Sequence, residues 1–307
     1  MKQYLRLYPE VHYALENGQP IVALESAVIT HGLPYPENVQ LAEELEQTVR
    51  NEGAIPATIA FLDGYIHIGL SPEDRQRLAT ATPKRKVSLR DMGIVLSRKE
   101  AGGTTVAATL QIAHQVGIKV FATGGIGGVH RESPFDISTD LPTLSRTPLV
   151  VVSAGAKAIL DLPATLEVLE TMGVPVIGYR TDEFPAFYSR ESGLPVNVRV
   201  ESPQEVAEIA RTQWDCQLHS AVLVVNPPPA ETALPREAIE ALIQKAVREA
   251  FEEGIRGAEV TPFLLARVSA LSGGESLKAN LALLRSNARL AAQIAHHLYT
   301  PRHLFRV

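Results

Sequence analysis

The sequence predicts a three-layer α/β/α fold built on a mixed, largely parallel central sheet. Short apolar runs rich in Val and Ile alternate with longer segments of helical periodicity over most of the 307 residues. The apolar runs mostly lack polar alternation, as expected for strands whose two faces are both covered by helices. No internal repeat, low-complexity tract or interdomain linker interrupts the pattern, so we expect one domain over residues 1–307.

Six apolar runs are predicted to be buried strands, and Asp63-Gly64 predicts a hairpin that leads into a seventh strand at 65–70. The hairpin makes the sheet mixed. The six runs are residues 21–26, 57–62, 118–124, 149–155, 174–180 and 221–226. Helical periodicity covers residues 37–51, 71–80, 104–116, 158–172, 202–217, 235–253, 261–271 and 275–299. Ser71 and Ser202, each followed by Pro, are typical of helix starts. Gly53, Gly117, Gly173 and Gly254 stand where a left-handed C-cap is needed.

The bulk composition excludes some classes of function. Hydrophobic residues make up 45% of the chain, charged residues 21%, and the formal net charge is −5. A nucleic-acid-binding face normally needs clustered Lys and Arg, so we expect no nucleic-acid partner, although a few local donors suffice for one phosphate. No segment resembles a signal peptide or a membrane span, and we expect a cytoplasmic protein without a membrane partner. The single cysteine, Cys216, excludes an intrachain disulfide and is predicted to be a packing residue rather than a nucleophile.

Polar or Gly-rich elements follow the ends of several predicted strands. Glu25 follows the strand that begins at residue 21, and the segment 123–131 (TGGIGGVHR) follows the strand that begins at residue 118. Lys157 and Asn226 come shortly after two later strands. Because ligands bind beyond the carboxyl ends of strands in open α/β sheets, these elements mark a candidate site.

Two Gly-rich segments are candidate anion sites. The segment 124–128 has four glycines within five residues, which lets backbone amides approach a phosphate closely. It matches neither the dinucleotide fingerprint nor a Walker motif, and a plain flexible turn is the alternative. The segment 102–105 (GGTT) opens a predicted helix, whose N-terminus would favour an anion.

Asp136 and Asp140 are hard oxygen ligands close in sequence. Two carboxylates suit a Mg²⁺ or Mn²⁺ ion that keeps several waters better than a full protein cage, and an Asx-type turn is the alternative. Lys157 follows a Val-rich strand and an Ala-Gly-Ala turn, immediately before a predicted helix. Burial or a neighbouring cation would free its amine to attack a carbonyl carbon. A lysine that extends to solvent is the alternative.

Five segments taken together resemble the pseudouridine-5′-phosphate glycosidase family, also called indigoidine-synthase-A-like. They are VALESAVITHGLPYPEN (22–38), AGGTTVAATL (101–110), KVFATGGIGGVHR (119–131), SAGAKAILDL (153–162) and the segment 261–280 with TPFLLARV and GGESLKAN. The resemblance implies a homotrimer, a divalent metal (typically Mn²⁺), and reversible conversion of pseudouridine 5′-phosphate to uracil and ribose 5-phosphate.

The resemblance also assigns roles to residues. It makes Lys157 the imine-forming nucleophile, Glu25 the proton donor and Asp136 a metal ligand. The residues that it places around the substrate are Lys86, Val106, His130, Ser138, Thr139, Asp140 and Asn280. One departure is the loop at 132–134, which is shorter than is usual in the family and lacks its glycine.

This chemistry explains the residue types, because a C–C glycosidic bond does not break on protonation of a heteroatom leaving group. A lysine nitrogen on C1′ lets uracil leave once its C5 is protonated, and an acid such as Glu25 fits the proton transfers. Two alternatives remain. One is another imine-forming sugar-phosphate lyase or aldolase, and the other is a non-catalytic nucleotide or sugar-phosphate sensor.

Overall fold

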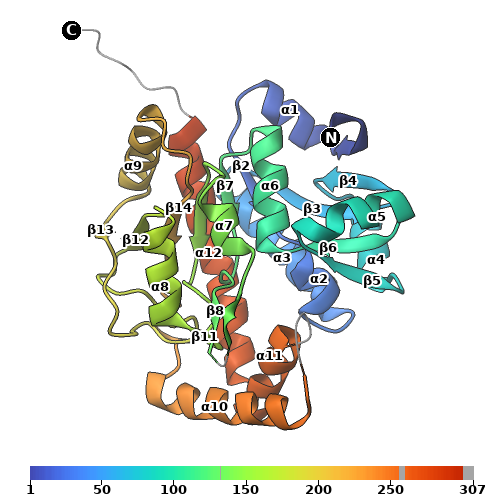
Figure 1. Cartoon of the computed structure of the whole chain (residues 1–307). Helices are drawn as coiled ribbons and strands as arrows, with labels where there is room; N and C mark the ends of the chain where they lie inside the picture. The colour runs from blue at the N-terminus through green and yellow to red at the C-terminus, as the bar shows by residue number, and fades with distance from the viewer. Residues whose placement is uncertain (132, 256–259, 300–307) are drawn as a thin grey trace, which may run out of the picture.

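The computed structural model describes residues 1–131, 133–255 and 260–299 and has helices on both faces of a central sheet (Figure 1). The strands of this sheet are β1 (Leu5–Leu7), β2 (Ile21–Leu24), β3 (Ile55–Leu62), β4 (Tyr65–Ile68), β5 (Lys84–Val87), β6 (Ala101–Thr104), β7 (Val120–Ala122), β10 (Val150–Ser153), β12 (Val176–Tyr179), β13 (Val198–Val200) and β14 (Val222–Val225). Its main path runs β1-β4-β3-β2-β7-β10-β14-β12-β13. From β3 to β13 the neighbouring strands are parallel, whereas β3 pairs antiparallel with β4 and β6. The predicted mixed, largely parallel sheet is confirmed.

The helices pack in two layers, with α3, α9 and α12 on one face of the sheet and α6, α7 and α8 on the other (Figure 1). The helices are α1 (Pro9–Glu16), α2 (Ala27–His31), α3 (Glu37–Asn51), α4 (Pro72–Thr80), α5 (Met92–Arg98), α6 (Val106–Val116), α7 (Asp140–Leu144), α8 (Leu162–Thr171), α9 (Pro203–Asp215), α10 (Arg236–Glu252), α11 (Val260–Leu271) and α12 (Glu275–Tyr299). None of these helices in the described ranges combines the length and hydropathy that a bilayer-spanning segment needs.

The helix ends that were predicted from capping residues are confirmed at Ser71, Ser202 and Gly117. The side chains of Ser71 and Ser202 accept hydrogen bonds from the backbone amides of Asp74 and Glu205, in the first turns of α4 and α9. Gly117 ends α6 with a φ of +87°, a conformation that costs little without a Cβ. The prediction for Cys216 was wrong, because it caps the C-terminus of α9 as an exposed residue.

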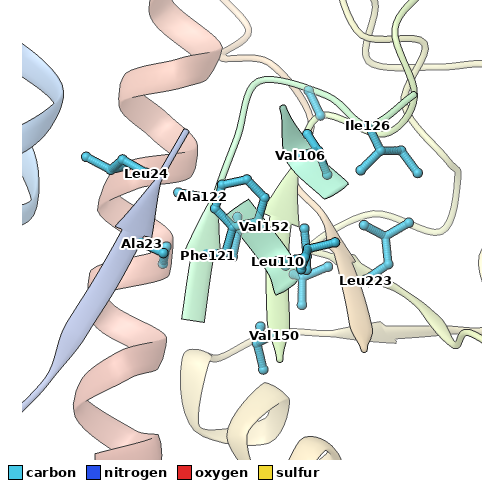
Figure 2. Packing of buried hydrophobic residues seen from close by; sticks show 14 of the residues in the cluster. Ala23, Leu24, Val106, Leu110, Phe121, Ala122, Ile126, Val150, Val152 and Leu223 are labelled. Atoms are coloured by element: carbon cyan, nitrogen blue, oxygen red, sulfur yellow. The ribbon is translucent and has the colours of Figure 1, made fainter. Parts of the chain in front are cut away.

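The core forms where the middle strands meet the covering helices. Ala23, Phe121, Val152 and Leu223 come from four adjacent parallel strands and are all buried (Figure 2). Leu110 from α6 packs in the same cluster. The middle strands therefore have no polar face, which explains why their sequences lack alternation. Only the residues beyond their carboxyl ends are left for chemistry.

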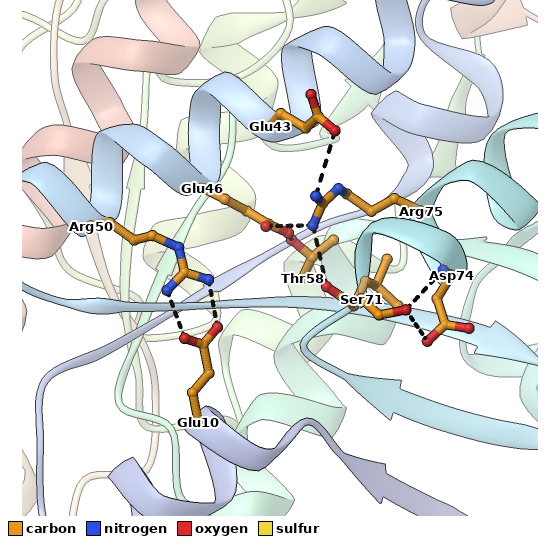
Figure 3. A network of polar contacts seen from close by, with 9 residues as sticks. Glu10, Glu43, Glu46, Arg50, Thr58, Ser71, Asp74 and Arg75 are labelled. Atoms are coloured by element: carbon orange, nitrogen blue, oxygen red, sulfur yellow. Dashed lines mark hydrogen bonds and ion pairs between the residues drawn. The ribbon is translucent and has the colours of Figure 1, made fainter.

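A buried ionic network joins α3 to α4 (Figure 3). Arg75 donates a hydrogen bond to Glu46 at 2.8 Å, and both side chains are largely buried. Thr58 of β3 donates a second hydrogen bond to Glu46 at 2.7 Å. Burial raises the pKa of Glu46, while the Thr58 hydrogen bond and the charge of Arg75 oppose the rise. The pair depends on both partners, because either charge left alone would be buried without compensation.

Candidate active site

A cavity of about 630 Å³ lies beyond the carboxyl ends of β2, β7 and β10, as the strand-end rule predicts. Glu25, the glycines of residues 124–127 and Lys157 line it, and they follow these three strands in turn. Residues of α11 and the N-terminal half of α12 close the other side with mostly apolar side chains. The cavity therefore has charged residues on the sheet side and a mixed apolar and polar wall on the two helices.

Glu25 stands directly after β2 and faces two lysines. Thr123, directly after β7, donates a hydrogen bond from its hydroxyl to Glu25 Oε1. Burial raises the pKa of Glu25, the charge of Lys157 opposes the rise most strongly, and Thr123 and Lys86 also oppose it. A raised pKa favours catalysis by a proton donor, because the carboxyl group keeps its proton at pH values where an ordinary glutamate has lost it.

Lys157 lies in the cavity, but the helix predicted at 158–172 begins later, at Leu162. Its amide donates to the carbonyl of Ile126 at 3.1 Å, and Ala156 forms an isolated bridge with the same residue. The chain then forms the short strand β11 (Leu160–Asp161), which pairs with β8 (Val129–His130), before α8 begins. The turn with Lys157 is thus fixed between two strands and bonded to the Gly-rich loop.

Lys86 reaches the cavity from β5, an edge strand that the apolar pattern did not predict. Burial lowers the pKa of Lys86, and the charge of Lys157 lowers it further, while Glu25 and Asp140 oppose both effects. Its register partner in β6 is Gly103. The two glycines of the GGTT segment therefore lie within a strand, before the helix that the segment opens. A Cβ on Gly103 would lie 2.3 Å from Thr30 Oγ1, so this glycine permits close packing, while Thr105 and Val106 at the start of α6 line the cavity.

Asp140 ties together two loops at the cavity wall. Its Oδ1 accepts a hydrogen bond from the amide of Ala107 at 2.9 Å, in the first turn of α6, and its Oδ2 accepts one from Gly127 at 2.7 Å. The side chain is buried, and a carboxylate is favourable at a helix N-terminus. Asp140 lines the cavity as predicted, and it also organises the backbone around the cavity.

The Gly-rich loop combines close packing with backbone amides that have no hydrogen-bond partner among the described residues. A Cβ on Gly125 would lie 2.7 Å from the ring of Phe187, and a Cβ on Gly127 would lie 2.2 Å from Ser138 Oγ. Close packing thus explains part of the glycine density. The amides of Gly124 and Gly125 donate no hydrogen bond to another described residue, and both glycines line the cavity. These two amides fit the predicted role as anion donors.

The remaining predicted substrate residues also line this cavity. They are Val106, His130, Ser138, Thr139 and Asn280. Asp136 does not line it. It is exposed on β9 (Ser133–Ile137), and within the described part of the chain no three His, Cys, Asp or Glu side chains gather in a group that could hold a metal. A single exposed carboxylate fits only an ion that keeps most of its waters. Glu132, in the shortened loop, lies outside the described residues.

The prediction missed several lining residues. His31 ends α2, its Nδ1 lies 2.7 Å from Thr30 Oγ1, and burial, with the charges of Lys86 and Lys84, lowers its pKa. Phe187 and Tyr188 come from the connection between β12 and β13. Phe187 has a φ of +61°, which is uncommon for a residue with a side chain. His31 lies within the quoted resemblance, whereas the aromatic pair gave no periodic signal.

Comparison with known proteins agrees with this geometry. The family model described as indigoidine synthase A like protein matches residues 10–297. The chain belongs to the indigoidine synthase A-like family. This confirms the resemblance seen in the sequence. A member from Caldanaerobacter subterraneus subsp. tengcongensis, named pseudouridine-5′-phosphate glycosidase, is 53% identical over 300 residues, which cover 97% of this chain and 98% of the relative.

Two solved structures share the fold of this family member. The prealnumycin C-glycosynthase AlnA, in complex with ribulose 5-phosphate, is 40% identical with a TM-score of 0.89, and the match covers 97% of both chains. An indigoidine synthase A-like protein from Thermotoga maritima is 38% identical with a TM-score of 0.88, covering 96% of this chain and 97% of that one. The predicted α/β/α fold class is confirmed by both.

Proposed function

We propose that this chain is a pseudouridine-5′-phosphate glycosidase, which reversibly converts pseudouridine 5′-phosphate to uracil and ribose 5-phosphate. One observation carries the proposal: Lys157, Glu25 and Lys86 meet in a single cavity beside unpaired loop amides. Relatives that share about half of its residues over nearly its whole length have this name. In this proposal Lys157 bonds to the sugar carbon C1′, Glu25 transfers the proton, and the loop amides bind the phosphate.

The reaction begins with opening of the ribose ring, in which the C1′–O4′ bond breaks and the Lys157 amine bonds to C1′. The nitrogen loses a proton and O4′ gains one, so the nitrogen keeps a lone pair for the next step. Protonation of uracil C5 follows, and the C1′–C5 bond breaks as the nitrogen lone pair forms the imine. Uracil leaves with the added proton. Water then hydrolyses the imine, which frees the Lys157 amine and leaves the aldehyde of ribose 5-phosphate.

Glu25 is the proposed proton donor, since burial keeps its proton at neutral pH more often than for a solvated glutamate. Lys86 and the amides of Gly124 and Gly125 are the proposed phosphate and hydroxyl donors. Charge-assisted hydrogen bonds to the phosphate, remote from the breaking bond, would orient the open-chain sugar beside Lys157.

We keep a divalent metal, most simply Mn²⁺, as part of the proposal. Asp136 would hold it as a single protein ligand with a shell of waters, and the bound ion would supply positive charge. We also propose that the protein is a homotrimer, on the strength of the family resemblance, and that it is located in the cytoplasm. Sedimentation of the purified protein tests the trimer directly.

A second candidate is the formation or cleavage of another C-glycoside. The favouring observation is the relative AlnA, named as a prealnumycin C-glycosynthase, whose structure holds a pentulose phosphate. This candidate keeps Lys157 and the phosphate donors and changes only the group that leaves C1′. A non-catalytic sensor is the third reading, and it predicts that Lys157→Arg leaves ligand binding unchanged while no turnover exists to lose.

Incubation with pseudouridine 5′-phosphate, with Mn²⁺ or with EDTA, separates these candidates. We expect uracil to appear with Mn²⁺, to stop after EDTA treatment and to return when Mn²⁺ is added. No uracil under any condition would reject the proposed function. Full activity after verified metal removal would reject only the metal.

A further inference from the structure

A buried chain of hydrogen bonds runs from Glu25 away from the cavity. The hydroxyl of Thr123 donates to Glu25, and the backbone carbonyl of Thr123 accepts from Asn287 Nδ2 at 2.8 Å. Asn287 Oδ1 in turn accepts from Asn226 Nδ2 at 3.0 Å. Each link joins a different element: Glu25 follows β2, Thr123 follows β7, Asn287 lies in α12 and Asn226 follows β14.

None of the three residues behind Glu25 reaches the substrate space. Thr123 is 2% exposed, Asn287 is 0% exposed, and neither they nor Asn226 line the cavity. Two buried asparagines in a largely apolar core cost free energy unless every polar atom has a partner. Both polar atoms of the Asn287 side chain make hydrogen bonds in this series, Nδ2 to the Thr123 carbonyl and Oδ1 to Asn226. These two bonds fix the orientation of the Asn287 side chain.

The arrangement fixes the direction of one hydroxyl group. The carbonyl of Thr123 accepts a hydrogen bond from Asn287, and the amide of Thr123 donates to the carbonyl of Val152 at 3.0 Å. The backbone of Thr123 is therefore fixed by hydrogen bonds on both its carbonyl and its amide. The side chain then presents its hydroxyl to Glu25. A threonine fixed in this way provides a donor that does not have to be ordered when substrate binds.

We infer that Thr123 and Asn287 are positioning residues that fix the Glu25 carboxyl group toward Lys157 and set the pH at which it exchanges its proton. The inference rests on the proposed role of Glu25 as proton donor. Thr123 stabilises the ionised carboxylate by donating to it, which opposes the effect of burial. The charges of Lys157 and Lys86 also lower the pKa of Glu25, whereas the charge of Asp140 raises it. Asn287 acts through Thr123, to which its shorter hydrogen bond is made, although its Nδ2 also lies 3.5 Å from the carbonyl oxygen of Gly124.

The first test compares the pH dependence of kcat/KM for uracil release in Thr123→Val, Thr123→Ser and wild type. Valine has nearly the shape of threonine without the donor, so the pKa of Glu25 rises. The high-pH limb of the kcat/KM profile, where Glu25 loses its proton, therefore moves to higher pH by about one unit. Serine keeps the donor and restores the wild-type profile. Thr147→Val is the matched control, because Thr147 is equally buried and donates to Thr143 instead. A folded Thr123→Val with an unshifted limb overturns the inference, as does an equal shift in Thr147→Val.

The second test asks whether Asn287 acts through Thr123. Asn287→Ala shifts the same limb in the wild-type background and adds no further shift in the Thr123→Val background, since the donor is already absent. Additive shifts overturn the role of Asn287. Infrared titration of the Glu25 carboxyl band, assigned with Glu25→Gln, reads the same shifts without turnover. If wild type releases no uracil, the proposed function fails, and the infrared shift alone decides this inference.

Discussion

Asp140 accepts a hydrogen bond from the backbone amide of Ala107 at 2.9 Å, and its second oxygen accepts the amide of Gly127. One carboxylate therefore holds the start of α6 and the Gly-rich loop at a fixed separation. The residues alone predicted that Asp140 is a metal ligand or part of an Asx-type turn, and the family resemblance implied that it contacts the substrate. Its bonds show that it first organises the backbone on which any substrate must rest.

Asp140→Asn should destabilise the protein by about 1–3 kcal/mol, because the new amide group cannot accept and one buried backbone donor is left without a partner. Denaturant unfolding measures the loss. Asp136→Asn is the matched control, since Asp136 is exposed and should change stability by less than about 0.5 kcal/mol. Equal effects of the two substitutions would show that the Asp140 contacts contribute nothing specific.

Borohydride with ribose 5-phosphate should attach one pentose phosphate to Lys157, because reduction traps the imine as a stable amine. Peptide mass mapping identifies the residue that has the pentose phosphate adduct. Lys86 is the competing amine, since it lines the same cavity with a lowered pKa. The adduct should persist in Lys86→Arg and vanish in Lys157→Arg. The opposite pattern would transfer the covalent role to Lys86.

Glu25→Gln should bind substrate but lower kcat by about 10²–10⁴, the usual contribution of a positioned general acid. Glutamine keeps the shape and most hydrogen bonding and removes the transferable proton. In deuterated solvent, wild type should release uracil with deuterium at C5. Near-normal turnover in the glutamine variant would mean that the proton comes from another donor.

Unphosphorylated pseudouridine should be a poor substrate. Each charge-assisted hydrogen bond lost with the phosphate is worth about 1.5–3 kcal/mol, so kcat/KM should fall by orders of magnitude. Lys86→Met should reduce this preference for the phosphorylated substrate. Lys84→Met should not, because Lys84 Nζ is bonded to the carbonyl of Ala79. Similar turnover of nucleoside and nucleotide by wild type would place the phosphate outside the binding site.

Arg75→Met should destabilise the protein by about 3–5 kcal/mol at neutral pH, because Glu46 would remain as an uncompensated buried charge. Without Arg75, the pKa of Glu46 rises further. The deficit should therefore be full above that pKa and shrink as the pH falls through it, when Glu46 becomes neutral. Arg77→Met, which removes an exposed pair with Asp63, should cost at most about 1 kcal/mol. A pH-independent deficit in Arg75→Met would contradict this account.

The strongly patterned elements were predictable from sequence. The predicted helix at 37–51 matches α3 residue for residue, and the hairpin at Asp63-Gly64 joins β3 to β4. The strands β5 and β6 were missed, because KRKV and AGGT have little apolar character and are strands only through their partners. The helix expected at 158 starts later, because Leu160 pairs with His130.

The site was predictable where it depends on strand ends. Glu25, the glycines and Lys157 follow from the topology of a parallel sheet, which needs only the order of strand and loop. Phe187 and Tyr188 were not predictable, since an aperiodic connection with a positive φ gives no local pattern. The bonds of Asp140 and Thr123 were equally hidden, because they join positions far apart in the chain.

The bond between Asn287 and Thr123 spans 164 residues. During translation, the Gly-rich loop and Lys157 leave the ribosome well before α12 exists to cover them. At about 5–20 residues per second, the 164 residues from Thr123 to Asn287 take roughly 8–33 seconds to make. Until α12 is made, the face of β2, β7 and β10 that it covers lacks this helix, and the pocket that would capture a sugar phosphate lacks one of its walls.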